Sequence, residues 1–208
     1  MRVVGNALLW LLSVSVAAYA VIVYAFLPLG AAVEPSMRAG FATHATAVYL
    51  HAFAASVALL LGPLQFAAGF RREHPQIHRW LGRAYLGIGV LVGGISALYL
   101  AQFAHGGPAA RMGFAALGVA WLYTGVRAFL AIRSAAVAEH RRWMIRNFAL
   151  TFGAVMLRLY IPASVAAGAD FDRAYAIVAW LCWVPNLLLA EWLSNRSGSR
   201  SGSPRPAL

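Results

Sequence analysis

The chain has 208 residues, of which 62% are hydrophobic and only 11% are charged, and its formal net charge is +11. A soluble domain of this size does not carry so much apolar surface, so the composition excludes the soluble globular class and indicates a membrane protein. All 17 basic residues are arginines, and most of them fall between apolar segments. This placement argues against a nucleic-acid-binding surface and favours a role in membrane topology, with the lipid bilayer and its anionic headgroups as partners.

Six apolar segments meet or approach the length of about 20 residues that a helix needs to cross the hydrocarbon layer. Because lipid offers no hydrogen-bond partners, each segment must be helical. The sequence therefore predicts an all-α polytopic membrane helix bundle with a single transmembrane domain over residues 1–194. Its six helices are expected at about 7–29, 45–70, 75–104, 110–133, 138–167 and 173–193. Pro63, Pro162 and Pro185 predict kinks in the second, fifth and sixth of them.

Both ends of the chain need a separate interpretation. Residues 195–208 are rich in Ser, Gly, Arg and Pro and cannot bury an apolar face, which predicts a disordered cytoplasmic tail. Near the amino terminus, Ala18-Tyr19-Ala20 resembles the cleavage site of a secretory signal. The apolar run continues to Leu27 and is too long for a signal core, so we interpret this segment as an uncleaved first helix.

The arginines predict the orientation of the bundle. With the amino terminus in the cytoplasm, cytoplasmic segments hold 13 arginines, and the opposite side holds only Arg38, Arg111 and Arg173. Arg158 is left within a predicted helix. The positive-inside rule therefore predicts that both termini are cytoplasmic.

Two cytoplasmic joints have similar sequences. Arg71 precedes His78-Arg79-Trp80 by seven residues, and Arg133 precedes His140-Arg141-Arg142-Trp143 by seven residues. The similarity predicts a parallel repeat of helices 2–3 and 4–5. One interpretation is an interfacial anchor, in which the arginines bind phosphates and the tryptophans lie in the headgroup layer. In the other, His78 and His140 converge on one ligand or metal, with Arg79 and Arg141 beside them.

Polar side chains lie within the second and the fifth predicted membrane helix. His51 lies about 9 Å from the start of the second helix at a rise of 1.5 Å per residue, and Gln65 lies further along the same face. Arg158 shares a face of the fifth helix with Asn147, and such a polar stripe should face the bundle interior. No carboxylate lies at the depth of Arg158 within the apolar segments. We therefore treat His51, Gln65, Asn147 and Arg158 as candidate ligand-binding residues, with helix–helix hydrogen bonding as the structural alternative.

Three stretches of this sequence resemble a known bacterial family: Leu61-Gly62-Pro63-Leu64-Gln65-Phe66, residues 78–85, and residues 140–151 together with Arg158. The family is catalogued as domain of unknown function 2306, predicted polytopic membrane proteins. The resemblance covers about residues 45–162 and implies a multi-pass inner-membrane protein without assigning an activity. It implies that His51, His78, His140 and Arg158 are the matching polar positions.

A weaker resemblance, of architecture only, is to the di-haem transmembrane cytochromes b, which bind haem between histidines on a four-helix core. It implies haem b as a cofactor, with an inner histidine pair (His78 and His140) and an outer pair (His51 and His105). This chain departs from that pattern because His105 sits at a helix end and the inner pair sits at helix starts.

Three functions therefore stay open. The first is a transporter or a protein that binds an anionic ligand or lipid headgroup. The second is a haem-binding redox protein, and only in that case would the chain be an enzyme, an oxidoreductase. The third is a structural or assembly subunit, for which a homo-oligomer or a membrane partner subunit is expected. Neither a hydrolytic triad nor a paired-carboxylate site is apparent in the sequence.

The topology can be tested with a reporter that is active only in the cytoplasm. Fused after Leu208 or inserted near Ala135, the reporter should be active, whereas near Gly107 or Gly168 it should be silent. Activity of an insertion at Gly107 would contradict the arginine count.

Overall fold

The computed structural model describes residues 2–199, with side chains from residue 7 to residue 194, and its described part is helical with turns and no strand. The elements are α1 (Arg2–Phe26), η1 (Pro35–Met37), α2 (Arg38–Thr43), α3 (Ala45–Phe66), α4 (Ala68–Glu73), α5 (Pro75–Ala84), η2 (Tyr85–Val92), α6 (Gly93–Ala101), α7 (Gly107–Arg133), α8 (Val137–Thr151), α9 (Gly153–Ala166), α10 (Phe171–Leu181) and α11 (Val184–Ser199).

Six helical spans among the described residues are long and apolar enough to cross a membrane, which confirms the predicted all-α bundle. They are Ala7–Phe26, Ala45–Phe66, Pro75–Ala101, Gly107–Arg133, Val137–Ala166 and Phe171–Ser194. Their ends differ from the predicted ends, most clearly in the second span, which ends at Phe66 before the separate short helix α4. The last helix continues to Ser199, into the segment predicted to be disordered, and residues 200–208 of that tail lie outside the described residues.

Three spans are interrupted between their ends. The third contains an eight-residue π-helix, η2, between α5 and α6, a rare element that is frequent at functional sites. The fifth is interrupted at Phe152, while α9 runs through Pro162. The sixth is interrupted between Leu181 and Val184, directly before Pro185, because proline favours the first turn of a new helix.

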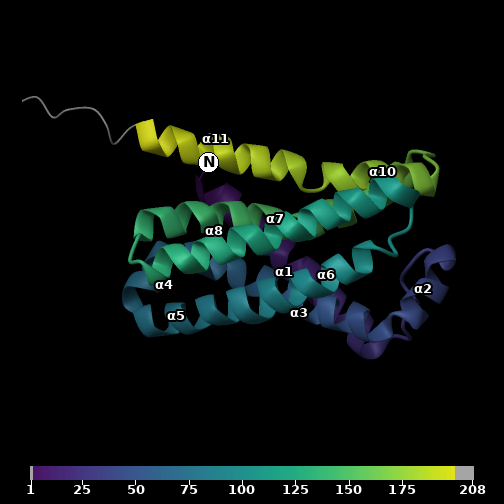
Figure 1. Ribbon diagram of the computed structural model, residues 1–208, viewed down its shortest axis with the longest axis horizontal. Helices are drawn as coiled ribbons and strands as arrows, with labels where there is room; N and C mark the ends of the chain where they lie inside the picture. Colours follow the sequence, from purple (N-terminus) through teal and green to yellow (C-terminus); the bar gives the residue numbers. More distant parts are fainter. Residues whose placement is uncertain (1, 200–208) are drawn as a thin grey trace, which may run out of the picture.

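The bundle has two distinct ends (Figure 1). The α4–α5 and α7–α8 turns lie at one, which we call the α4 end. The short helix α2, the α6–α7 loop and the α9–α10 loop lie at the other, the α2 end. Between them, α3 packs against α1, η2 and α6, and α7 packs against α6, α8 and α10.

Small residues let the central helices approach closely. A Cβ atom placed on Gly89 of η2 would lie 2.9 Å from the Cβ of Ala58 and 3.1 Å from its backbone. Gly62 of α3 is similarly covered by the ring of Phe148 from α8. Because lipid tails are as apolar as the helices, close van der Waals packing of this kind holds membrane helices together.

Two glycines of η2 provide a matched test of this packing. Gly89→Ala should destabilise the protein by about 1–3 kcal/mol because the new methyl group meets the backbone of α3. A Cβ atom placed on Gly87 would have no heavy atom within 4 Å, so Gly87→Ala should be neutral or stabilising by up to about 1 kcal/mol. Thermal unfolding in detergent, followed by circular dichroism, measures both changes. Equal stabilities of the two variants would contradict the close α3–η2 contact.

Candidate functional site

A cavity of about 350 Å³ lies at the α2 end and extends into the bundle. Side chains from all six spans and from α2 line it. Most of the lining is apolar, and the side chains with polar atoms include His44, His51, His105, Trp121, Arg158 and Tyr175. A cavity of this size, mostly apolar with a few polar groups, is typical of sites for small organic molecules.

His51 is held in this cavity by a hydrogen bond to the residue that directly follows the π-helix. Its Nδ1 lies 3.0 Å from the carbonyl oxygen of Gly93, the first residue after η2. A carbonyl can only accept, so Nδ1 carries the proton and donates. No described residue bonds to Nε2, which in the neutral imidazole keeps a lone pair. His51 thus offers a hydrogen-bond acceptor to the cavity.

Arg158 contributes the positive charge of the cavity. Its Nη1 donates to the carbonyl oxygen of Ala154 at 3.1 Å, one turn earlier in α9, and its Cζ lies 6.0 Å from the ring centroid of Tyr19. All six side-chain carboxylates of the chain belong to described residues. None of them forms an ion pair with Arg158. A guanidinium without a carboxylate at this depth is suited to binding an anion.

His51 and Arg158 lie at comparable depths below the α2 end. His51 is six residues beyond the start of α3, about 9 Å along the helix, and Arg158 is eight residues before the end of α9, about 12 Å along it. Both side chains line the same cavity, together with Tyr24 and Tyr175. His51 and Arg158, predicted at depth in two different helices, therefore belong to one site.

A buried polar network forms the inner wall of the cavity. Thr151 accepts a hydrogen bond from Trp121 Nε1 at 2.8 Å, and its Oγ1 lies 2.9 Å from Tyr85 Oη. The Tyr85 hydroxyl donates to Asn147 Oδ1 at 2.7 Å, and Asn147 Nδ2 donates to Thr124 Oγ1 and to the carbonyl oxygen of Trp121, both at 2.8 Å. Trp121 and Thr151 line the cavity.

The same network explains the predicted polar stripe of the fifth helix. Asn147 is completely buried and Thr151 nearly so, which places both in the bundle interior as predicted. Asn147 was also predicted to bind a ligand. Both of its side-chain polar atoms are hydrogen-bonded within the protein, and it does not line the cavity.

Two histidines stand near the mouth of the cavity. The ring of His44 stacks on Phe103 at a centroid distance of 4.0 Å, and its Nδ1 lies 3.0 Å from Tyr99 Oη. His105 Nε2 pairs with the carboxylate of Asp172 at 2.5 Å, which joins the α6–α7 loop to the start of α10. His44 had no predicted role because a single histidine outside the apolar segments carries little signal.

The remaining predicted residues lie at the α4 end. His78 and His140 are each the fourth residue of their helices, α5 and α8, and the two rings interact electrostatically. His140 Nδ1 donates to the carbonyl oxygen of Ala128 at 2.8 Å. Arg79 and Arg141 are exposed at the surface. The structure therefore divides the candidate residues between the two ends of the bundle.

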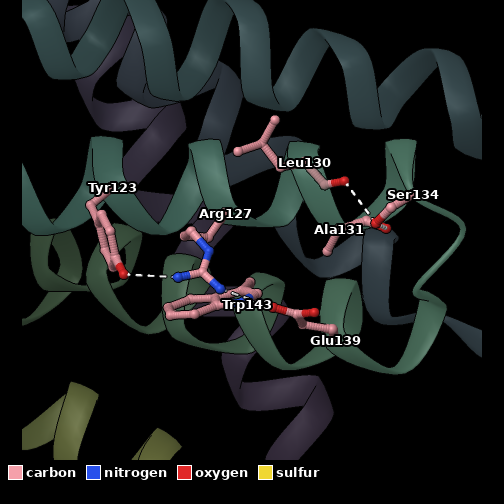
Figure 2. A network of polar contacts seen from close by, with 7 residues as sticks. All are labelled: Tyr123, Arg127, Leu130, Ala131, Ser134, Glu139 and Trp143. Atoms are coloured by element: carbon pink, nitrogen blue, oxygen red, sulfur yellow. Dashed lines mark hydrogen bonds and ion pairs between the residues drawn. The ribbon is translucent and has the colours of Figure 1, made fainter.

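An ion-pair cluster that the sequence did not reveal joins α7 and α8 (Figure 2). Arg127 donates to Glu139 Oε1 at 3.0 Å and to Tyr123 Oη at 3.1 Å, and its Cζ lies 4.7 Å from the ring centroid of Trp143. Trp143 Nε1 donates to the same carboxylate at 3.0 Å. Trp143 is thus oriented by protein contacts, and Arg127 has its counter-ion.

A second ion pair holds α8 to α11. Arg146 donates through Nε and Nη2 to both carboxylate oxygens of Glu191, at 2.5 and 2.7 Å. This bidentate geometry is the strong form of the arginine–carboxylate pair. Arg127 and Arg146 therefore differ from Arg158, which has no carboxylate partner among the described side chains.

The histidines considered for haem lie in two places, His51 and His105 on the cavity at the α2 end and His78 and His140 at the α4 end. The described part of the chain holds no group of three or more His, Cys, Asp or Glu side chains that could bind a metal ion. Haem b and a metal between His78 and His140 stay predictions.

Comparison with known proteins gives one match. The family model described as "Predicted membrane protein (DUF2306)" matches residues 48–194. This range includes His51, the π-helix, both joints and Arg158, and it extends into the sixth span beyond the resemblance recognised in the sequence. No curated protein and no solved structure matches the chain.

Replacing Thr151 tests the inner wall. Thr151→Val keeps the side-chain volume but leaves the buried Trp121 N–H without its acceptor, which should cost about 1–3 kcal/mol of stability. Thr43→Val is the control, because the exposed Thr43 hydroxyl bonds only to the Ala39 carbonyl oxygen of its own helix, and it should change stability by less than about 0.5 kcal/mol. Thermal unfolding in detergent compares them. A Thr151→Val protein as stable as the wild type would show that the network does not stabilise the bundle.

Proposed function

The chain belongs to the family of predicted membrane proteins described as domain of unknown function 2306, and we propose that it binds a small amphipathic organic anion in the cavity at the α2 end. The observation that carries this proposal is Arg158, a cation inside the cavity without a carboxylate partner.

The charge of the ligand follows from the cost of burying Arg158. A charged side chain inside a membrane bundle is expensive unless it is paired. The planar guanidinium fork matches a carboxylate or a phosphate and can bind either through two parallel hydrogen bonds. The phenols of Tyr24 and Tyr175 near the guanidinium are neutral and cannot replace an anion. A bound anion would therefore complete the site.

The rest of the ligand follows from the other lining residues. The apolar lining from α1, α3, α6 and α7 favours a hydrocarbon or aromatic body. His51 Nε2 accepts a hydrogen bond in the neutral imidazole, so a ligand with a donor group near its anionic group would contact both residues. An amphipathic acid of modest size satisfies these requirements, and a strongly polar anion such as sulfate does not.

The direction of access follows from the position of the cavity. The arginine distribution supports an orientation in which the α2 end faces away from the cytoplasm, so ligand would enter from that side or from the outer leaflet of a bacterial inner membrane. Trp121 and Thr151 line the cavity and form a hydrogen-bonded layer with Tyr85. These observations support binding, and transport would additionally require this layer to open.

A matched acid and amide test the proposal. The full-length protein in nanodiscs should bind 4-phenylbutyrate measurably more tightly than the neutral 4-phenylbutyramide. Arg158→Gln should weaken acid binding by about 10- to 100-fold, the equivalent of losing one charge-assisted interaction of about 1.5–3 kcal/mol. Arg158→Lys should recover little of the loss, because an ammonium lacks the planar fork. Isothermal titration calorimetry measures the affinities.

The control is Arg173→Gln, which removes an exposed arginine from the same end and should leave acid binding unchanged. Equal binding of acid and amide by the wild type, or wild-type affinity in Arg158→Gln, would contradict the proposal. Loss of both Arg158 variants from the membrane fraction would instead assign Arg158 a structural role.

A further inference from the structure

We propose a second binding site at the α4 end, formed by Gln65, Arg71, His78 and His140, which binds a phosphate group. This cluster, which we call the α4 cluster, lies at the opposite end from the cavity, and its argument does not depend on the proposed function.

Gln65 supplies an unpartnered donor. Its side chain is only 7% exposed, yet its Nε2 has no hydrogen-bond partner among the described residues. Its Oε1 lies 3.1 Å from the Cβ position of Gly82 on α5, so the amide is directed at that helix. A buried amide without a partner costs about 1–3 kcal/mol, which indicates that a ligand atom satisfies it.

His78 supplies a second unpartnered nitrogen, on the face of α5 that the Gln65 amide contacts. Its Nδ1 is buried without a hydrogen-bond partner among the described residues. His78 and Gly82 are four residues apart on α5, so they lie on one face about one helical turn from each other. The Gln65 amide, packed against Gly82, is therefore within about one turn of the His78 ring.

The charges around these nitrogens favour an anion. Arg71 Nη1 lies 3.4 Å from the backbone carbonyl oxygen of Gln65 at the end of α3. Arg71 and His140 lie near enough to His78 to act on its ring electrostatically. The bond from His140 Nδ1 to Ala128 leaves its Nε2 free. A cation would be repelled by Arg71, whereas an oxyanion would accept from Gln65, His78 and Arg71 together.

The place of the α4 cluster favours phosphate over other oxyanions. The third span begins at Pro75, so the cluster lies where the lipid headgroups begin. Trp80, one turn into α5, is 67% exposed, and the Cζ of Arg83 lies 4.8 Å from its ring centroid, an arrangement suited to the interface. Basic pockets between membrane helices at this level bind phosphate-bearing headgroups. The phosphate could be that of an anionic lipid or free phosphate.

Lipid and phosphate titrations of full-length protein test the site. Adding phosphatidic acid to phosphatidylcholine nanodiscs should raise the melting temperature of the wild type, and native mass spectrometry should show the retained lipid. Arg71→Gln and Gln65→Leu should each lower the affinity for phosphatidic acid about 10-fold or more. The rise in melting temperature at a given lipid content should therefore be smaller in both variants. Arg72→Gln, which removes an exposed arginine next to Arg71, should respond like the wild type.

A second titration, with inorganic phosphate added to protein in phosphatidylcholine nanodiscs, distinguishes a lipid headgroup from free phosphate as the ligand. If inorganic phosphate raises the melting temperature, the site binds free phosphate. If only phosphatidic acid raises it, the site binds a lipid headgroup.

Two results would overturn the site. One is an unchanged response of Arg71→Gln to both probes. The other is a Gln65→Leu protein that is more stable than the wild type and keeps the full response, which would mean that Gln65 is satisfied by water only. Should Gln65→Leu fail to fold, Arg71→Gln alone decides, because Arg71 is exposed. Arg158→Gln should keep the wild-type response, so failure here is distinguishable from failure of the proposed function.

Discussion

Hydrocarbon supplies no hydrogen-bond partner, and so each polar group between the ends of this bundle must be satisfied inside the protein. Most are satisfied locally. Ser56, Ser96 and Thr124 donate to carbonyl oxygens one turn earlier in their own helices. Asn147, whose amide cannot be satisfied in this way, is held by α7 and by Tyr85 of the π-helix. The packing of the central helices depends on this requirement as much as on shape.

The same requirement makes the exceptions informative. Arg158 lacks a carboxylate, and Gln65 and His78 each keep a buried nitrogen without a partner among the described residues. Ser13 on α1 is a further case, but a single hydroxyl does not specify a ligand. Arg158 is itself the cation of the cavity at the α2 end, and Gln65 and His78 lie beside Arg71 in the α4 cluster. Both places are therefore suited to anions, an amphipathic acid in one and a phosphate in the other.

The π-helix connects the fold to the cavity. The carbonyl oxygen of Gly93, the residue that follows it, accepts side-chain hydrogen bonds from His51 and Ser96. His51 is thus held in one tautomer with its acceptor nitrogen free. Gly89 of the same element allows α3 to approach, so one irregular segment both brings His51 near α6 and orients its ring.

The sequence by itself determined the six membrane spans, the all-helical class and the interior position of the Asn147 and Arg158 stripe. These are properties of one segment at a time: apolar length decides whether a helix spans, and helical spacing decides which residues share a face. Only the tertiary structure decided which residues meet. His51 and Arg158 share a cavity because α3 and α9 line it together, Asn147 is occupied by partners on η2 and α7, and Glu139 and Glu191 neutralise arginines 12 and 45 residues away in the chain. Such partners lie on other helices. The distance between the paired groups is set by how the helices pack, and no local sequence pattern encodes that packing.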